Sequence, residues 1–170
     1  DEAGFLMTPR YDEKREATRQ AFAGAEVRRS AHAGSAYPDE PGELRDLFSD
    51  YLSAPENVAA DPSKLAGIAA PHVSPEGGWE AYREAFRSFP QDAASGAFAD
   101  KVFVVLGTSH YGEAGRFGLT RKNFVTPLGE ARTETAWVDY LEREAPDGIL
   151  MEDYCHAVEH SIEFQIVFLQ

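Results

Sequence analysis

The sequence predicts an α/β fold, a layered domain with a central, mainly parallel sheet flanked by helices. Two short apolar runs, residues 65–70 and 102–106, lack alternating polar residues, which is typical of strands buried on both faces of a sheet. Segments of 10–12 residues with helical periodicity separate the strand candidates, as in layered α/β domains. Hydrophobic residues make up 43% of the 170 residues, enough to bury a core.

Helices are predicted at three places in the first part of the sequence. Residues 1–30 form a charged helical lead-in or linker, because 11–22 is rich in helix-forming Glu, Lys, Arg and Ala. The main domain is predicted over residues 31–170. Residues 43–52 carry apolar side chains at the i, i+3, i+4, i+7 and i+8 spacing of an amphipathic helix. Residues 79–89 show a similar aromatic stripe that ends before a proline.

Strands and two more helices are predicted beyond these. Residues 65–70 and 101–106 are the buried strands, and 117–120 and 123–125 are shorter candidates. A helix capped by Thr133 is expected to run to about Glu144. A last helix is predicted over residues 156–170.

The charge and the cysteine count exclude several classes of protein. Sixteen basic residues against 29 acidic ones give a net charge of −13, which disfavours binding to nucleic acid or to an anionic membrane. The acids are densest in residues 130–163, which form either a solvated surface or an attractor for cations or a basic partner. No apolar run approaches the ~18–20 residues that span a bilayer. Cys155, the only cysteine, cannot form an internal disulfide and is expected to be a small buried residue, so a cytoplasmic setting is expected.

Two histidines follow the predicted buried strands. His72 comes two residues after the first strand, and His110 comes four residues after the second. If the strands are parallel neighbours, both imidazoles emerge at the carboxyl edge of the sheet, where open α/β sheets build their sites. Two converging neutral imidazoles suit Fe, Cu or Zn. The alternative is two unrelated loop histidines.

A second pair of histidines has the spacing His156-x-x-Glu159-His160. On a helix the two imidazoles would share a face, and the pattern matches the inverted zinc-peptidase signature H-x-x-E-H. A zinc hydrolase using these three residues is one hypothesis. A polar helix face with no catalytic role is the alternative.

Five motifs in order resemble those of Memo-like proteins, a family named from the mediator of ErbB-driven cell motility, whose prokaryotic members are called AmmeMemoRadiSam system protein B. The resemblance covers about residues 27–170. The motifs are His32-Ala33-Gly34-Ser35-Ala36-Tyr37-Pro38, Ala70-Pro71-His72, Leu106-Gly107-Thr108-Ser109-His110, Thr126-Pro127-Leu128-Gly129 and Glu159-His160-Ser161-Ile162-Glu163.

The resemblance implies a fold similar to class III extradiol dioxygenases, which use non-heme Fe(II). It implies that His72 and His110 are metal ligands and that His160 is a catalytic proton shuttle or substrate contact. Fe(II) is the expected cofactor, with Cu or Zn as alternatives. The family's third ligand, a cysteine in its carboxy-terminal half, has no counterpart in these residues, and Cys155 is not at the matching motif. A carboxy-terminal segment or a second chain is therefore expected to complete the site and the domain.

The same resemblance leaves two function classes open. The first is redox or dioxygenase-like chemistry on a small aromatic or peptide substrate, within a modification system that includes radical-SAM and AMMECR-like partners. The second is a binding or scaffold protein that holds a peptide or similar ligand without turnover. The isolated 170-residue chain is expected to bind metal weakly or not at all, because two histidines leave coordination incomplete.

Overall fold

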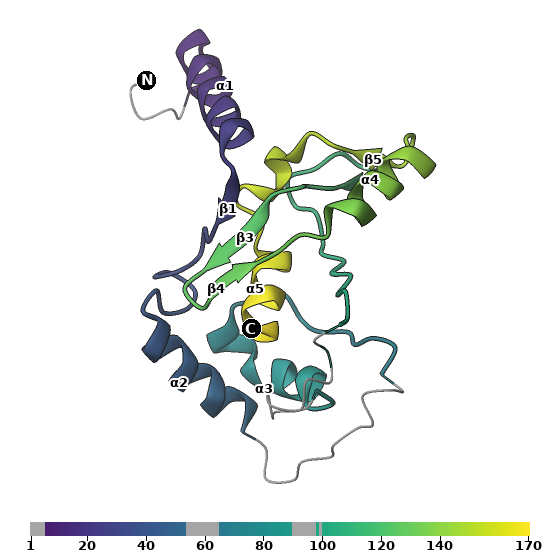
Figure 1. The fold of residues 1–170 in the computed structure, drawn as a ribbon. Coiled ribbons are helices and arrows are strands. Elements are labelled where there is room, and N and C mark those ends of the chain that lie inside the picture. The colour runs from purple at the N-terminus through teal and green to yellow at the C-terminus, as the bar shows by residue number, and fades with distance from the viewer. Residues whose placement is uncertain (1–5, 54–64, 90–97, 99) are drawn as a thin grey trace. The chain divides into compact units, whose positions relative to one another are not determined.

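The computed structural model of the chain describes residues 6–53, 65–89, 98 and 100–170. It confirms the mixed α/β class (Figure 1). The helices are α1 (Pro9–Gly24), α2 (Pro41–Leu52), α3 (Pro75–Phe86), α4 (Thr135–Glu144), the 3-10 helix η3 (Asp153–His156) and α5 (His160–Leu169). The strands are β1 (Val27–Arg29), β2 (Phe117–Gly118), β3 (Asn123–Thr126), β4 (Gly129–Ala131) and β5 (Ile149–Leu150).

The described strands form two small sheets. One is three-stranded with the order β1-β3-β4, and the other pairs β2 with β5. The β2–β5 pair is parallel, with Phe117 opposite Ile149 and Gly118 opposite Leu150. The predicted strands at 117–120 and 123–125 thus correspond to β2 and β3, although β2 is shorter than predicted.

The chain divides into two compact units made of alternating segments. Unit 1 contains residues 1–29, 109–124 and 132–159, and unit 2 contains 30–108, 125–131 and 160–170. The division into a lead-in over residues 1–30 and a main domain over residues 31–170 remains a prediction. In the part of the chain that the structure describes, no helix is both long and apolar enough to cross a membrane.

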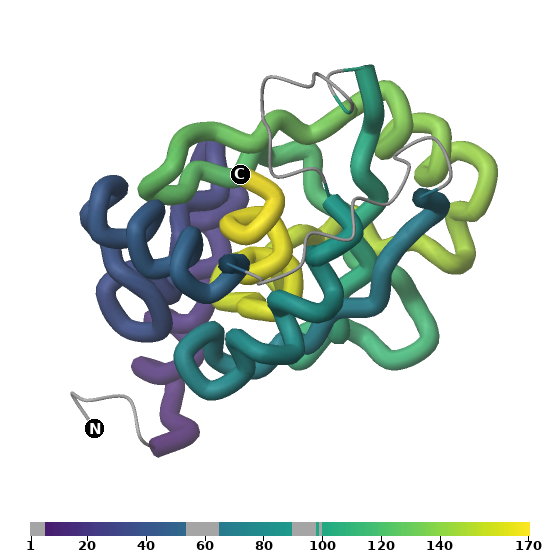
Figure 2. The backbone as a smooth tube through the Cα atoms, turned by 90° about the horizontal axis from the view of Figure 1, so that it is seen from below, coloured from purple at the N-terminus to yellow at the C-terminus, as the bar shows by residue number. Residues whose placement is uncertain are grey.

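The core of unit 2 is aromatic and centres on α5. Phe168 stacks on Phe48 of α2 at 4.3 Å and on Tyr82 of α3 at 4.2 Å between ring centroids. Leu44 and Val167 are also almost fully buried in this cluster. The three helices lie together in both views (Figures 1 and 2). This packing anchors α5, whose first residue is His160.

Unit 1 is held by smaller contacts. The rings of Phe22 from α1 and Tyr154 from η3 meet edge to face at 5.9 Å. Lys122 donates to the Ala23 carbonyl at 3.2 Å and pairs with Asp153 at 3.4 Å. Together these contacts tie the end of α1 to η3.

Several helix boundaries differ from the prediction, among them the end of α3 at Phe86, and three of the differences have a local cause. α3 starts at Pro75, four residues early, because proline suits the first turn of a helix. α4 is capped by the Glu134 side chain, which accepts from the Ala136 amide, and not by Thr133. The predicted helix over 156–170 is wrong at its start, because residues 153–156 form η3 and α5 begins only at His160.

The two predicted buried strands also differ from the prediction. Residues 65–70 and 101–106 run without regular secondary structure and join neither sheet. Val104 and Leu106 are 78% and 79% exposed. The apolar sequence therefore predicts more burial than these segments have in this chain.

Candidate metal-binding residues

In unit 1, the Glu159 carboxylate holds His110 at two points. One carboxylate oxygen accepts from the His110 backbone amide at 2.8 Å, and the other lies 2.9 Å from Nδ1 of the same residue. The Glu159 side chain is 4% exposed, whereas that of His110 is 36% exposed. A carboxylate favours the proton on Nδ1, which places the lone pair of the neutral ring on Nε2. That is the tautomer in which imidazole binds a metal through Nε2.

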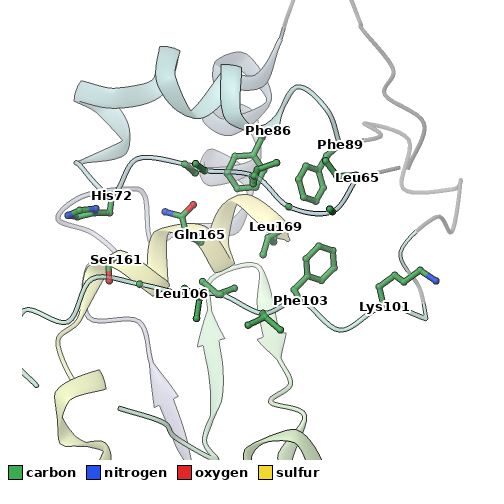
Figure 3. A pocket seen from close by; sticks show the side chains of 18 of the residues that line it. Leu65, His72, Phe86, Phe89, Lys101, Phe103, Leu106, Ser161, Gln165 and Leu169 are labelled. Atoms are coloured by element: carbon green, nitrogen blue, oxygen red, sulfur yellow. The ribbon is translucent and has the colours of Figure 1, made fainter. Parts of the chain in front are cut away.

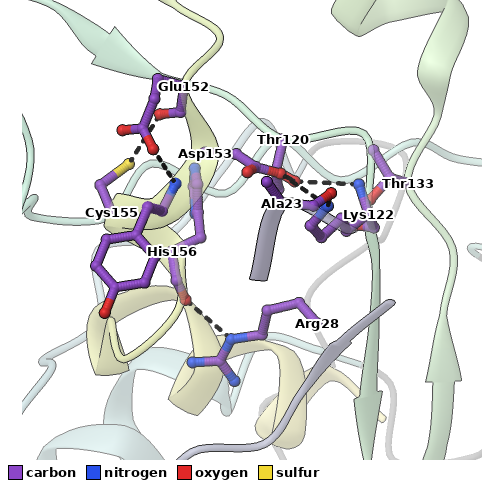
Figure 4. A network of polar contacts seen from close by, with 10 residues as sticks. Ala23, Arg28, Thr120, Lys122, Thr133, Glu152, Asp153, Cys155 and His156 are labelled. Carbon is purple, nitrogen blue, oxygen red and sulfur yellow. Dashed lines mark hydrogen bonds and ion pairs between the residues drawn. The ribbon is translucent and has the colours of Figure 1, made fainter. Parts of the chain in front are cut away.

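Arg28 of β1 fixes the segment that carries Glu159. Its Nε donates to the His156 carbonyl at 3.0 Å (Figure 4), and Nη2 donates to the Glu159 carbonyl at 2.9 Å. The residue is 1% exposed, and its guanidinium lies 5.3 Å from the centre of the Phe124 ring. Two bonds from one buried guanidinium define the path of residues 156–159. The Glu159 carboxylate is thereby directed at His110.

In unit 2, three imidazoles gather at the start of α5. The ring of His160 lies 5.7 Å from that of His72 and 5.8 Å from that of His32, measured between centroids. Phe164, one turn later on α5, packs on His160 at 5.5 Å and on His32 at 5.7 Å. Two of the predicted site residues, His72 and His160, are therefore neighbours within one unit.

Glu163 joins the first motif of the chain to the last. Its carboxylate, 0% exposed, accepts from the backbone amides of Ala31 at 2.9 Å and His32 at 3.0 Å. The hydroxyl of Tyr37 donates to the same carboxylate. A buried carboxylate with three donors holds its geometry firmly. This bridge sets the position of His32 beside His160 on α5.

Gly107 and Ser161 let α5 approach the segment that leads to His110. The Ser161 hydroxyl donates to the Thr108 carbonyl at 2.8 Å. A Cβ on Gly107 would lie 2.5 Å from both Ile162 Cγ1 and Ser161 Oγ, so only glycine fits without a shift. The motif Leu106-Gly107-Thr108-Ser109-His110 therefore contains residues that pack against α5 as well as the candidate metal ligand His110.

The H-x-x-E-H helix is not formed. His156 ends η3, and Ala157, Val158 and Glu159 separate it from α5. His156 is 7% exposed and its Nε2 lies 3.1 Å from the Gly118 carbonyl. Burial lowers its pKa below the usual 6.5, although the Gly118 carbonyl and nearby Asp153 act in the opposite direction. A buried neutral imidazole bonded to a main-chain carbonyl, with the neighbouring Glu159 bound to His110, has the features of a structural residue.

Cys155 is buried, as the sequence predicts. Burial and the carboxylates of Glu152 and Asp153 raise the pKa of its thiol. A raised pKa keeps the sulfur protonated as a thiol, and the thiol binds metal less well than the thiolate does. Cys155 therefore has the properties of a packing residue.

The structure places the predicted site residues in both units. His72 and His160 belong to unit 2, and His110 belongs to unit 1. Sequence reasoning missed Glu159 as the partner of His110 and missed the bridging role of Glu163. A signal for Glu163 is present in the sequence, because a lone carboxylate between Ile162 and Phe164 in an apolar helix needs buried partners.

Comparisons with known proteins agree with the motifs. The family model described as Memo-like protein matches residues 28–170. The chain is similar to a MEMO1 family protein of Aquifex aeolicus, with 26% identity over 170 residues, which is 100% of this chain and 43% of that protein. It is also similar to MEMO1 family proteins of Archaeoglobus fulgidus, with 31% identity over 81% of this chain and 47% of the relative, and of Methanopyrus kandleri, with 30% identity over 84% and 51%.

The chain spans about half the length of the curated relatives it matches. The family model nevertheless covers most of the chain, including every residue of the five motifs. The chain belongs to the Memo-like family.

Proposed function

We propose that the protein binds a single non-heme metal ion through His72 and His110, with His160 as the third histidine of the site. Fe(II) is the proposed metal, with Cu or Zn as alternatives. The observation that carries the proposal is the double hydrogen bond between Glu159 and His110. A carboxylate behind a metal-binding histidine orients the ring and strengthens its donor nitrogen.

The donor set fits such an ion. Neutral imidazoles bind Fe, Cu and Zn, and burial of Glu159 keeps its carboxylate on His110. Two or three imidazoles with no anionic ligand leave the coordination incomplete. We therefore propose that the remaining ligand comes from polypeptide beyond this chain, and that this chain alone binds metal weakly.

Chain connectivity supports bringing His110 towards His160. Within unit 2, the Ser161 hydroxyl is bonded to the Thr108 carbonyl, and His160 directly precedes Ser161. His110 is only two residues beyond Thr108. Because one residue spans at most ~3.6 Å, the Cα of His110 stays within ~7 Å of the Cα of Thr108.

The roles of the chain's residues follow from this arrangement. When bound, the metal would supply redox or Lewis-acid chemistry, including chemistry with oxygen. His72 and His110 would hold it, and Glu159 would keep the proton on Nδ1 of His110. His160, packed against Phe164, would give or take a proton within hydrogen-bond reach of a small aromatic or peptide substrate.

The biological setting is proposed from the family resemblance alone. It suggests a modification system with radical-SAM and AMMECR-like partners. The alternative is a scaffold that holds a peptide or similar ligand without turnover. Oxygen uptake with a panel of catechols by the Fe(II)-loaded full-length protein separates the two, because a scaffold would show tight peptide binding and no uptake.

Metal titration of variants tests the site. Anaerobic Fe(II) is titrated into the full-length protein, in which the coordination is proposed to be complete, in competition with a chromophoric chelator. We expect His72→Ala and His110→Ala to weaken binding by more than about tenfold, since each removes a ligand. His156→Gln is the matched control, because its side chain can still donate to the Gly118 carbonyl.

The titration can contradict the proposal in two ways. Unchanged Fe(II) affinity in His110→Ala would remove His110 from the site. An equal loss in a folded His156→Gln would return the H-x-x-E-H hypothesis. His160→Ala is expected to retain most of the metal affinity and to lose oxygen uptake in the full-length protein.

A further inference from the structure

Side chains from two helices of unit 2 hold the main chain on both sides of His72. The residue lies between Pro71 and Val73, in a segment that has no regular secondary structure and joins neither sheet. On one side, Gln165 Nε2 of α5 donates to the Pro71 carbonyl at 2.8 Å (Figure 3). On the other side, the hydroxyl of Tyr82 of α3 donates to the Val73 carbonyl at 2.9 Å. The two hydrogen bonds therefore flank the candidate ligand.

These bonds restrict the backbone of His72. The Pro71 carbonyl belongs to the peptide group that contains the His72 amide, and because a peptide group is planar, a bond to its oxygen also fixes that amide. The bond to the Val73 carbonyl fixes a second peptide group two residues further on. Only the backbone dihedrals of His72 and Val73 lie between the two groups, so the direction in which the imidazole leaves the backbone is narrowly set.

Tyr82 is a firm anchor for one of the two bonds. It is 0% exposed, and its ring stacks on that of Phe168 at 4.2 Å. Burial raises the pKa of its hydroxyl to about 12, although the Gln165 amide acts in the opposite direction, so the hydroxyl keeps its proton and can donate. One turn earlier on α3, a Cβ on Gly78 would lie 2.4 Å from Val73 Cγ2. The helix therefore meets Val73 at two points.

Gln165 carries a cost that a residue used only for packing would avoid. Its Oε1 is buried and has no hydrogen-bond partner among the described residues. A buried acceptor without a donor is unfavourable, and an apolar side chain of similar size would remove that cost. An apolar side chain could not, however, donate to the Pro71 carbonyl. The donor bond therefore indicates a role for Gln165 beyond filling space.

α5 carries both His160 and one support of His72. Gln165 follows His160 by five residues, which is about 7.5 Å along the axis of a helix. The rings of His160 and His72 lie 5.7 Å apart between centroids. Because one ring and the support of the other belong to the same helix, the distance between the two rings is tied to the geometry of α5.

We propose that Gln165 and Tyr82 are positioning residues for His72, which hold its main chain so that its imidazole stays beside His160 and is ready to bind the metal. The effect on metal affinity rests on the proposed function, whereas the ordering of His72 needs no metal. Glu159 supports His110 through both the backbone amide and the ring. His72 would be supported through the main chain alone.

Backbone mobility in the absence of metal tests the ordering. The full-length protein is produced with isotope-labelled histidine and kept in chelator, and the His72 amide signal is identified by its loss in His72→Gln. Gln165→Met and Tyr82→Phe each remove a donor and keep the size of the side chain. In each, we expect the order parameter of the His72 amide to fall from about 0.85 to below about 0.6. Either variant suffices if the other does not fold.

Two controls separate positioning from general destabilisation. The backbone amides of His32 and His110 have carboxylate acceptors of their own and are expected to keep their order parameters in both variants. Phe48→Leu weakens the same aromatic core, because Phe48 stacks on Phe168 at 4.3 Å, but it removes neither hydrogen bond. We expect it to lower the urea midpoint at least as much and to leave the His72 amide ordered.

Metal affinity tests the consequence of the ordering. In the competition titration with the chromophoric chelator, we expect Gln165→Met and Tyr82→Phe to weaken Fe(II) binding to the full-length protein by about tenfold, the lower end of the loss seen when a support of a metal ligand is removed. Phe48→Leu is expected to bind Fe(II) as the unmodified protein does.

Two results would overturn the positioning role. They are an unchanged His72 amide in the folded variants and an equally mobile one in Phe48→Leu. A mobile His72 amide with unchanged Fe(II) affinity, in a protein whose affinity His72→Ala does weaken, would overturn the consequence for metal binding. Unchanged affinity in His72→Ala itself would instead overturn the proposed metal site, and the order parameters would still decide the positioning role.

Discussion

Glu159 accepts hydrogen bonds from both the backbone amide and Nδ1 of His110, 49 residues earlier in the chain. The two bonds fix where His110 lies and which ring nitrogen carries the proton. Glu159, which precedes His160 in the last motif, therefore positions His110 of an earlier motif. In this way one motif supplies the support and the other supplies the candidate ligand.

Replacing Glu159 by Gln is expected to weaken metal binding without unfolding the protein. The amide is uncharged and can no longer act as the strong acceptor that holds the Nδ1 proton. Loss of such a carboxylate partner costs ~10–100-fold in metal affinity. The measurement is an anaerobic Fe(II) titration against a chromophoric chelator. Glu144→Gln, on an exposed residue at the end of α4, is the control. Equal affinities of the two variants would contradict the role given to Glu159.

Glu163→Gln is expected to destabilise the protein by about 3 kcal/mol. The glutamine offers one acceptor oxygen, and its NH2 group faces at least one of the amide donors of Ala31 and His32. Urea denaturation followed by circular dichroism gives the free energy of unfolding. Tyr37→Phe removes one donor and leaves the carboxylate, so it should cost less, about 1–2 kcal/mol. A Glu163→Gln variant as stable as the unmodified protein would show that the bridge is dispensable.

Gly107→Ala is expected to destabilise the protein by about 1–3 kcal/mol. The new methyl group meets Ile162 and Ser161 at 2.5 Å, so the start of α5 must shift. Gly67→Ala is the control, because nothing lies within 4 Å of a Cβ built there. Its effect should stay within about 0.5 kcal/mol. Thermal unfolding of both variants makes the comparison, and equal midpoints would mean that the contact yields at no cost.

Acid is expected to destabilise the protein through His156. Because burial lowers its pKa in the folded state, the unfolded chain binds the proton more tightly. Stability is therefore greatest above the usual pKa of 6.5 and falls as the pH drops below it. Urea midpoints at about pH 7.5 and about pH 5.5 measure this loss. His156→Gln, which does not titrate, should show a smaller loss, and an undiminished one would place the effect on other groups.

Local patterns predicted two helices well, one from the amphipathic spacing of its apolar residues and the other from its helix-forming composition. Residues 43–52 lie within α2, and the 11–22 segment lies within α1. The start of α5 was mispredicted because its cause is remote. A helix through His156 would need that carbonyl to accept from His160, but it accepts from Arg28, which lies 128 residues away. No short window of sequence contains both partners.

The candidate ligands and their supports differ in how well sequence predicts them. His72 and His110 stand out because of their place after apolar runs. Glu159 and Glu163 resemble the other eight acids of residues 130–163, and only their buried partners distinguish them. Others in that stretch, such as Asp139 and Glu142, pair with Arg121 at the surface. Composition alone cannot separate the buried acids from the surface acids, because both carry the same charge.

The two units consist of six alternating chain segments, three in each unit. This alternation affects how the chain can fold during synthesis. The chain passes between the units at residues 29/30, 108/109, 124/125, 131/132 and 159/160. On the ribosome, neither unit can close until residues near 159 have emerged. Glu159 and Glu163 are synthesised well after His110 and His32, which they secure. High contact order of this kind slows folding, so nascent chains would expose their apolar segments for longer and depend more on chaperones.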